Sequence, residues 1–413
     1  MKAPQLLAPA GDFTSVDAAL AHGADALYIG LGAFNLRAHA PNFAPEDLPE
    51  LLERVHTKGR HVYYALNIMP DMRQIREIEA LLDRLSGDGT LPDAFIASDP
   101  GVIHLCRELV PETPLHLSTQ TGSFNQRSLR FWKELGIKRV VLPRELTLEQ
   151  VAGLAAMEIM ETEIFIHGAM CVSISGRCLM GAYMAGRHPN RGDCPQPCRW
   201  NYRITPCGQE KGQPTQVPWL DVEEDASGTF LLNARDLCTL SILPDCIGTG
   251  VSALKIEGRN KSAHYIAAVV KSYRAAIDDC IGDAGKYTVA DEWAELLEAI
   301  DHRPYTTGFY TGELQMQEVF TSKASSGARI VGVVKGLLPG GIPVIDVKNS
   351  FNPAEPLEIL PVNQTKIPYI VVFQRCTDLA GNELERIPSN RLIVVYCADR
   401  IQPGDMVRLR NTS

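Results

Sequence analysis

Four cysteines in the middle of the chain have the residue type and the clustering that metal chemistry needs. They are Cys171, Cys178, Cys194 and Cys238, whereas the first hundred residues contain no cysteine. Thiolates are soft ligands that hold zinc or iron–sulfur clusters. Six residues separate Cys171 from Cys178, while structural zinc sites favour about two to four residues within a ligand pair. The uneven spacing therefore favours an iron–sulfur cluster over zinc.

Polar residues that follow expected strands are the next candidates for chemistry. In a barrel of parallel strands the carboxyl ends meet at one rim, where active sites lie. The rim residues expected from the sequence are Asn67, Asp99, Thr119, Gln120, Arg144, Glu145, His167, Lys255, Glu257 and Arg259. His167 and Glu257 are the candidate catalytic residues, because imidazole can hold or release a proton near neutral pH. A structural histidine and a structural rim ion pair are the plainer alternatives.

A basic stretch surrounds the cysteines and is a candidate RNA contact. Its residues are Arg187, His188, Arg191, Arg199 and Arg203, with Tyr183, Trp200 and Tyr202 between them. Guanidinium groups neutralise phosphates and aromatic rings stack on unpaired bases. A solvated loop with a few cation–π contacts explains the same pattern.

The elements that must position these residues alternate between strand-like and helix-like runs. The expected strands are residues 5–8, 26–30, 61–67, 94–97, 115–118, 139–142, 163–167 and 253–257. Expected helices such as 13–22, 45–58, 149–157 and 261–280 lie between or after them. This rhythm predicts an α/β fold, a (β/α)8 TIM-like barrel, and leaves an open doubly wound sheet as the alternative.

Two domains follow from the same pattern. Residues 1–326 form the barrel domain, and the Cys-rich segment 170–238 interrupts the rhythm as an insertion on the functional face. Residues 327–413 form a small β domain with expected strands at 329–334, 343–347, 369–373, 391–396 and 405–409.

Composition narrows the class of protein. The chain has 413 residues, is 45% hydrophobic and carries a net charge of -9, so RNA binding would need a local basic patch. The start of the chain predicts neither a signal peptide nor a membrane span. We therefore expect a cytoplasmic protein whose eleven cysteines are ligands or free thiols. The sequence does not indicate an oligomeric state.

Several motifs together resemble the peptidase U32 family of collagenase-like proteins. The central motif runs from Glu163 through Phe165, Gly168, Ala169, Met170, Cys171 and Gly176 to Cys178. Further matches are residues 7–11, 22–28, 35–37, 142–145, 192–200 and 255–259. The motif departs at Gly181, where the family usually has serine. The last two matches resemble the branch of prephenate-dependent tRNA uridine 5-hydroxylases.

The resemblance implies an activity, a cofactor and a site. The activity is oxygen-independent 5-hydroxylation of the wobble uridine in the tRNA anticodon loop, with a 4Fe-4S cluster and prephenate as co-substrate. The implied cluster ligands are Cys171, Cys178, Cys194 and Cys238, and Cys198 is the alternative fourth ligand. Since prephenate carries two carboxylates, its candidate partners are Arg144, Arg259 and Arg37.

Other functions remain open at this point. Related proteins hydroxylate ribosomal RNA cytidine or ubiquinone precursors, and the family name suggests a peptidase. The sequence has no His-Glu-x-x-His zinc motif and no Gly-x-Ser-x-Gly motif, which disfavours proteolysis. A non-catalytic RNA-binding subunit would bind tRNA without modifying it.

Overall fold

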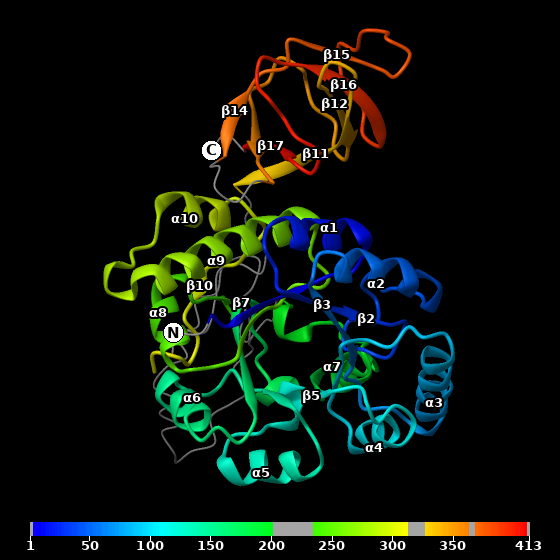
Figure 1. Ribbon diagram of the computed structural model, residues 1–413, viewed down its shortest axis with the longest axis vertical. Helices are drawn as coiled ribbons and strands as arrows, with labels where there is room; N and C mark the ends of the chain where they lie inside the picture. The colour runs from blue at the N-terminus through cyan, green and yellow to red at the C-terminus, as the bar shows by residue number, and fades with distance from the viewer. Residues whose placement is uncertain (1–2, 201–233, 313–326, 363–367, 411–413) are drawn as a thin grey trace, which may run out of the picture.

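The computed structural model describes residues 3–200, 234–312, 327–362 and 368–410. Within these residues the chain forms a closed barrel surrounded by helices and a separate antiparallel sheet at the carboxyl end (Figure 1). Among the described helices, none is both long and apolar enough to cross a membrane.

Eight parallel strands form the barrel. They are β1 (Gln5–Pro9), β2 (Ala26–Gly30), β3 (His61–Leu66), β4 (Ala94–Ala97), β5 (Leu115–Leu117), β6 (Arg139–Val141), β7 (Glu161–Ala169) and β9 (Ala253–Ile256). β9 closes the barrel because Ala253 aligns with Gln5 of β1 and with Glu163 of β7. The closed barrel confirms the expected (β/α)8 fold and excludes the open sheet.

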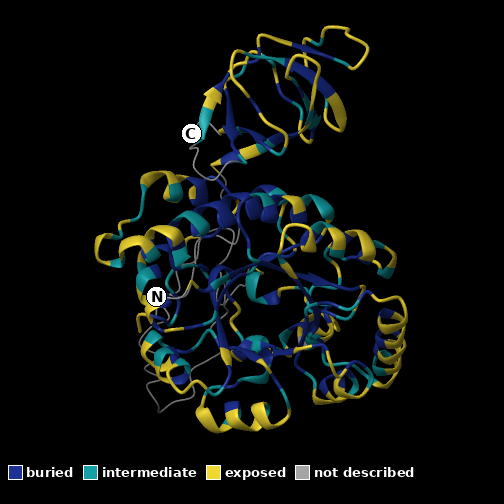
Figure 2. Cartoon of the chain, in the orientation of Figure 1, coloured by how far each residue is buried: buried dark blue, intermediate teal, exposed yellow. Residues whose placement is uncertain are grey.

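Helices cover the outside of the barrel. They are α1 (Phe13–Ala21), α2 (Leu48–His56), α3 (Met72–Gly87), α4 (Pro100–Leu109), α5 (Gln126–Glu134), α6 (Leu148–Ala155), α8 (Leu243–Gly248) and α9 (Ala263–Asp283). Their outer faces are exposed and their inner faces are buried against the strands (Figure 2). Side-chain caps fix where some of them begin: Asp71 accepts hydrogen bonds from the backbone N–H groups of Arg73 and Gln74 at the start of α3.

Two short strands extend the sheet beyond the barrel, and the sequence did not predict them. β8 (Asp236–Cys238) pairs antiparallel with the end of β7, and β10 (Tyr305–Thr306) pairs parallel with β8. Strands of three and two residues are too short to show the alternation that marks a strand in a sequence. The described part of the Cys-rich segment otherwise contains α7 (Met180–Ala185) and three single 3-10 turns, η3 (Ile174–Gly176), η4 (Pro189–Arg191) and η5 (Pro197–Arg199).

The carboxyl-terminal sheet has its own apolar core. Its strands are β11 (Ala328–Leu338), β12 (Ile342–Val347), β13 (Leu357–Leu360), β14 (Tyr369–Val371), β15 (Arg375–Thr377), β16 (Arg391–Tyr396) and β17 (Met406–Arg410). All pairs are antiparallel, in the order β14–β13–β17–β11–β12–β16–β15. The sequence predicted five of these strands and missed β13 and β15.

The sheet is attached to the barrel domain through polar contacts with α9 and α10 (Asp291–Glu298). Arg410 pairs with Glu295 of α10 at 2.9 Å. On α9, the Lys271 ammonium donates to the Pro361 carbonyl at 3.1 Å, and His264 lies 3.3 Å from the Arg408 guanidinium. Figure 1 shows the sheet standing next to α1, α9 and α10, away from the opposite half of the barrel.

Candidate functional site

A cavity of about 180 Å³ lies at the carboxyl ends of the barrel strands. Its lining includes Asn67 after β3, Ser118 after β5, Arg144 after β6 and Glu257 after β9. In (β/α)8 enzymes this face carries the active site, because loops from several strands converge there. The cavity therefore lies where a barrel of this kind places its active site.

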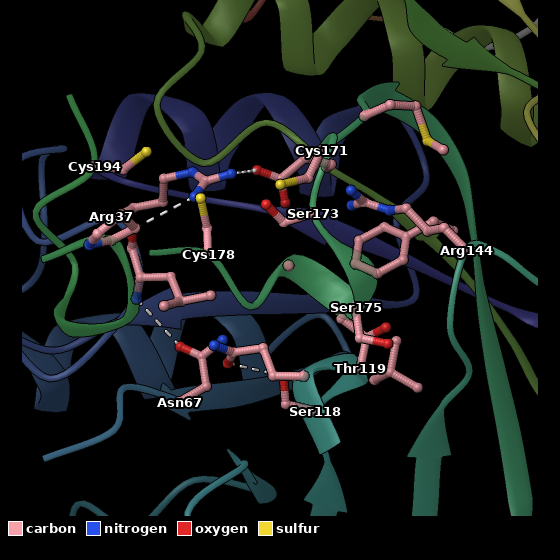
Figure 3. A pocket seen from close by; sticks show the side chains of 18 of the residues that line it. Arg37, Asn67, Ser118, Thr119, Arg144, Cys171, Ser173, Ser175, Cys178 and Cys194 are labelled. Atoms are coloured by element: carbon pink, nitrogen blue, oxygen red, sulfur yellow. Dashed lines mark hydrogen bonds and ion pairs between the residues drawn. The ribbon is translucent and has the colours of Figure 1, made fainter. Parts of the chain in front are cut away.

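Four cysteines line this one cavity: Cys171, Cys178, Cys194 and Cys198. Cys171 follows β7, and Figure 3 shows it near Cys178 and Cys194 on one side of the cavity. Asn190 holds the Cys178 backbone, because its side chain accepts from the Cys178 N–H at 3.1 Å and donates to the Cys178 carbonyl at 3.0 Å. The loops after β7 thus gather thiols that are distant in sequence.

These thiols have the chemistry that an iron–sulfur cluster requires. All four are free, and the described residues form no ready-made site for a single metal ion. Burial raises the pKa of Cys198, Arg199 opposes that shift, and negative charge on Cys171, Cys194 and Cys178 raises the pKa further. Thiolates that share one site repel one another unless cations lie between them. Four thiols are a donor set that iron–sulfur clusters and structural zinc sites both use.

Cys238 is not brought together with the other predicted ligands. It lies on β8 opposite His167 of β7, and the Tyr273 hydroxyl donates to its sulfur at 3.7 Å. Burial raises the pKa of the Cys238 thiol above its ordinary value. Of the two alternative fourth ligands, the structure places Cys198, and not Cys238, on the wall of the cavity.

The predicted arginines surround a buried carboxylate in the same cavity. Arg37 pairs with Glu257 at 2.9 Å, and the Tyr28 hydroxyl donates to the other Glu257 oxygen at 3.3 Å. Burial alone would raise the pKa of Glu257, but the positive charges of Arg37, Arg144 and Arg259 lower it below the ordinary value. Glu257 therefore stays ionised, and the three arginines around it outnumber it, which leaves positive charge beside Glu257 for an anionic ligand.

Arg144 and Arg259 each keep hydrogen-bonding capacity beyond these contacts. Arg144 stacks on the Phe165 ring, 3.7 Å from its centroid, and donates to the Ala169 carbonyl at 3.0 Å. Arg259 donates to the Asn35 side chain, and burial lowers the pKa of Arg259 to about 10. Among the described residues, Arg144 Nε and Arg259 Nη1 have no hydrogen-bond partner. Stacked, positioned guanidinium groups of this kind suit the binding of carboxylates.

The opposite side of the cavity is neutral and polar. We call it the amide–hydroxyl wall, and it consists of Asn67, Ser118, Thr119, Gln120 and Ser175. Figure 3 shows Asn67, Ser118, Thr119 and Ser175 across the cavity from Arg37 and the cysteines. The sequence indicated Asn67, Thr119 and Gln120 as rim residues but missed Ser118 and Ser175.

Ser175 is the member of this wall with an unusual backbone. Its φ of 48° lies in the left-handed region, which is unfavourable for a residue other than glycine. The Glu145 carboxylate accepts a hydrogen bond from the Ser175 N–H at 2.5 Å and holds this conformation. No sequence pattern marked Ser175, because a strained conformation of this kind depends on a partner thirty residues away.

Lys255, another predicted rim residue, lines the cavity but is already paired. It forms an ion pair with the buried Glu163 at 2.8 Å and lies 4.4 Å from the centroid of the Tyr28 ring. Arg139 pairs with Glu163 from the other side at 3.3 Å. These contacts make Lys255 part of the charged interior of the barrel below the cavity.

The structure does not bring His167 into the cavity. The ring is 1% exposed and lies among Tyr265, Tyr273 and Tyr305, with centroids 5.5 to 5.9 Å away. Burial lowers the pKa of His167 to about 3, so the ring is neutral near pH 7. Its surroundings are those of a structural residue, whereas Glu257, the other candidate catalytic residue, does line the cavity.

Part of the expected RNA contact lies near the cavity. Arg187 pairs with Asp193 at 2.6 Å, and Arg191 pairs with Asp71 at 3.4 Å, so both cations are partly neutralised. Trp200 is 39% exposed. Arg203 and Tyr202 lie outside the described residues, as does the side chain of Tyr183.

Comparisons with known proteins agree with the fold and the motifs. The model of peptidase family U32 matches residues 11–319. The chain is 34% identical to "tRNA hydroxylation protein P" of Escherichia coli, covering 86% of both chains. It is also 34% identical to "tRNA hydroxylation protein P1" of Bacillus subtilis, covering 98% of this chain and 95% of that one. A third relative, "Collagenase" of Porphyromonas gingivalis, is 29% identical over 78% of this chain and 77% of its own length. The chain therefore belongs to the peptidase U32 family.

Proposed function

We propose that this protein is a cytoplasmic iron–sulfur enzyme that hydroxylates the wobble uridine of tRNA at C5, with prephenate as co-substrate. The observation that carries the proposal is that one cavity on the catalytic face of the barrel is lined by four cysteines and three arginines. The names of the Escherichia coli and Bacillus subtilis relatives supply the class of substrate and reaction.

Different residues of the cavity would have different roles. Cys171, Cys178, Cys194 and Cys198 would hold a 4Fe-4S cluster, which supplies one-electron transfer. The guanidinium groups of Arg144 and Arg259 would bind the carboxylates of prephenate.

Glu257 would orient the cationic side of the cavity. Its ion pair with Arg37 and its hydrogen bond from Tyr28 fix the carboxylate, and through it the guanidinium of Arg37. The lowered pKa of Glu257 keeps it ionised, so it repels a ligand carboxylate from its own position and favours binding at Arg144 and Arg259.

The balanced net reaction determines which reactants an assay must contain. A hydroxyl replaces the hydrogen at C5 of uridine, so one oxygen atom enters while two electrons and two protons leave when water is the oxygen source. An electron acceptor, such as an oxidised redox dye or carrier protein, is therefore a reactant. If prephenate supplied the oxygen, its ring C–O bond would break as the ring loses CO2 and becomes aromatic. The oxygen would leave at the oxidation level of hydroxide, so the same two-electron acceptor is needed, and isotopically labelled water distinguishes the two sources.

The test is reconstitution under anaerobic conditions. Purified protein is incubated with unmodified tRNA, an oxidised acceptor and prephenate, and the tRNA is digested and analysed by nucleoside mass spectrometry. We expect 5-hydroxyuridine from the complete mixture and none without prephenate or with Cys171→Ser. Hydroxylated cytidine in a parallel reaction with ribosomal RNA, together with unchanged tRNA, would show that ribosomal RNA is the substrate instead.

Proteolysis is the second candidate, because one relative is named collagenase. No histidine of the described residues lines the cavity, so its cysteines have no general base of the kind that cysteine peptidases use. We expect no cleavage of collagen by protein freed of iron. Cleavage that Cys171→Ser and Cys194→Ser leave unchanged would show a peptidase site elsewhere in the chain.

A further inference from the structure

The cavity contains buried polar atoms that the fold leaves without partners. Among the described residues, five such atoms belong to side chains of its lining: Gln120 Nε2, Arg144 Nε, Glu145 Oε2, Ser175 Oγ and Arg259 Nη1. An unpaired buried polar atom is unfavourable, so most native proteins pair such atoms with water, protein or ligand. Five in one cavity on the catalytic face indicate a polar ligand.

The chemistry of these atoms favours an oxygen-rich acid over a nucleobase. Gln120 Nε2, Arg144 Nε and Arg259 Nη1 can only donate hydrogen bonds, and Ser175 Oγ can donate or accept. Glu145 Oε2 is the one acceptor that carries a charge. A nucleobase presents donors and acceptors together, whereas a hydroxy acid presents mainly acceptors, with one hydroxyl that could donate.

Cationic and neutral donors both line the cavity. Arg37 and Arg144 lie apart from Ser118 and Thr119 in Figure 3, so the cationic and neutral donors face the cavity from different sides. Prephenate, the co-substrate of the proposed function on which this inference rests, carries both acidic groups at one ring carbon and its hydroxyl at the carbon opposite. The cavity measures about 180 Å³, and arginines and neutral polar side chains both line it.

We propose that Gln120 determines specificity by donating a hydrogen bond from its side-chain amide to the ring hydroxyl of the acid co-substrate. Gln120 is 1% exposed and belongs to η2 (Thr119–Thr121), directly after β5. Its side-chain amide lies 3.5 Å from the Ser118 hydroxyl, and its Nε2 has no hydrogen-bond partner among the described residues. The arginines then bind the acidic end, and the amide–hydroxyl wall recognises the neutral end.

The experiment compares two ligands and three proteins. Anaerobically purified full-length protein, Gln120→Met and the exposed control Gln126→Met are titrated calorimetrically with prephenate and with an analogue that has hydrogen in place of the ring hydroxyl. Methionine keeps the length of glutamine and removes the donor. We expect Gln120→Met to raise the Kd of prephenate about tenfold, the typical effect of one lost hydrogen bond.

The analogue separates recognition from general damage. In wild type and Gln126→Met it should bind about tenfold more weakly than prephenate, and in Gln120→Met the two ligands should bind equally. Equal weakening of both ligands by Gln120→Met would overturn the proposal, because Gln120 would then only shape the cavity. Unchanged binding of both ligands would also overturn it while leaving the proposed function intact, whereas failure of wild type to bind prephenate at all would refute the co-substrate itself.

Discussion

Cys198 and Cys238 are two thiols whose surroundings predict different behaviour. Cys198 lines the cavity with Cys171, Cys178 and Cys194, whereas Cys238 lies on β8 beside Tyr273. A thiolate that binds iron contributes to cluster retention, and a buried thiol does not. We therefore expect Cys198→Ser to lose most of the iron and acid-labile sulfide of anaerobic preparations and Cys238→Ser to retain wild-type amounts.

Cys106→Ser provides the matched control, since Cys106 is buried on α4, far from the cavity lining. Iron and sulfide are measured chemically, together with the visible absorption spectrum, so no activity assay enters the comparison. Loss of iron from Cys238→Ser with retention in Cys198→Ser would show that the β8 thiol is the fourth ligand, as the family resemblance implies.

The rim residues show how far sequence reasoning reaches at this scale. Arg144, Glu257 and Arg259 were predicted because the ends of parallel strands converge, and all three line the cavity. His167 follows the same rule on β7 but points elsewhere, because the register of β7 against β9 shifts between Phe165 and His167. Such an irregularity redirects a side chain and leaves no pattern in the sequence.

At the scale of elements, a buried ion pair joins two strands of the carboxyl-terminal sheet. Arg408 of β17 is 0% exposed and pairs with Glu358 of β13 at 2.5 Å. Burial would raise the pKa of Glu358, but its bonds to Arg410 and the charge of Arg408 lower it. Removing one partner of such a pair leaves an uncompensated buried charge. We expect Glu358→Ala to lower the free energy of unfolding by roughly 3–5 kcal/mol.

The measurement is urea denaturation followed by circular dichroism, with Glu385→Ala as the control, because Glu385 is exposed. Glu385→Ala should change the unfolding free energy by less than about 0.5 kcal/mol. Equal midpoints for wild type and Glu358→Ala would mean that water reaches Arg408 and that the pair contributes little to the sheet.

Short elements set the limit of prediction at this scale. The eight barrel strands were found because short runs rich in apolar residues, such as Ala26–Gly30, alternate with helix-like stretches. β8, β10, β13 and β15 have two to four residues, and pairing with neighbouring strands decides their conformation. The equally short β5 and β6 were found through their place in the strand–helix alternation, whereas the local sequence alone of so short a strand does not distinguish it from a turn.

For the molecule as a whole, buried histidines predict sensitivity to mild acid. Burial is the main cause that lowers the pKa to about 3 in four of them: His22, His116, His167 and His264. Between pH 6.5 and about 3 the unfolded chain binds protons at these rings and the folded chain does not, so acid favours unfolding. Each histidine should remove about 1.4 kcal/mol of stability between pH 7.5 and 5.5, or roughly 5 kcal/mol for all four.

Between pH 7.5 and 5.5, other titratable groups have nearly the same protonation in the folded and unfolded states. Carboxylates with lowered pKa, such as Glu163 and Glu257, remain ionised in both states above pH 5.5. Lys271, whose pKa burial lowers to about 8, is mostly protonated below pH 7.5 in both states. The urea midpoint should therefore decrease from pH 7.5 through 6.5 to 5.5, as these four histidines take up protons in the unfolded chain. His22→Leu should reduce the slope by about a quarter. Midpoints that do not move between pH 7.5 and 5.5 would mean that the buried rings take up protons in the folded protein, with water or a carboxylate near enough to stabilise the charge.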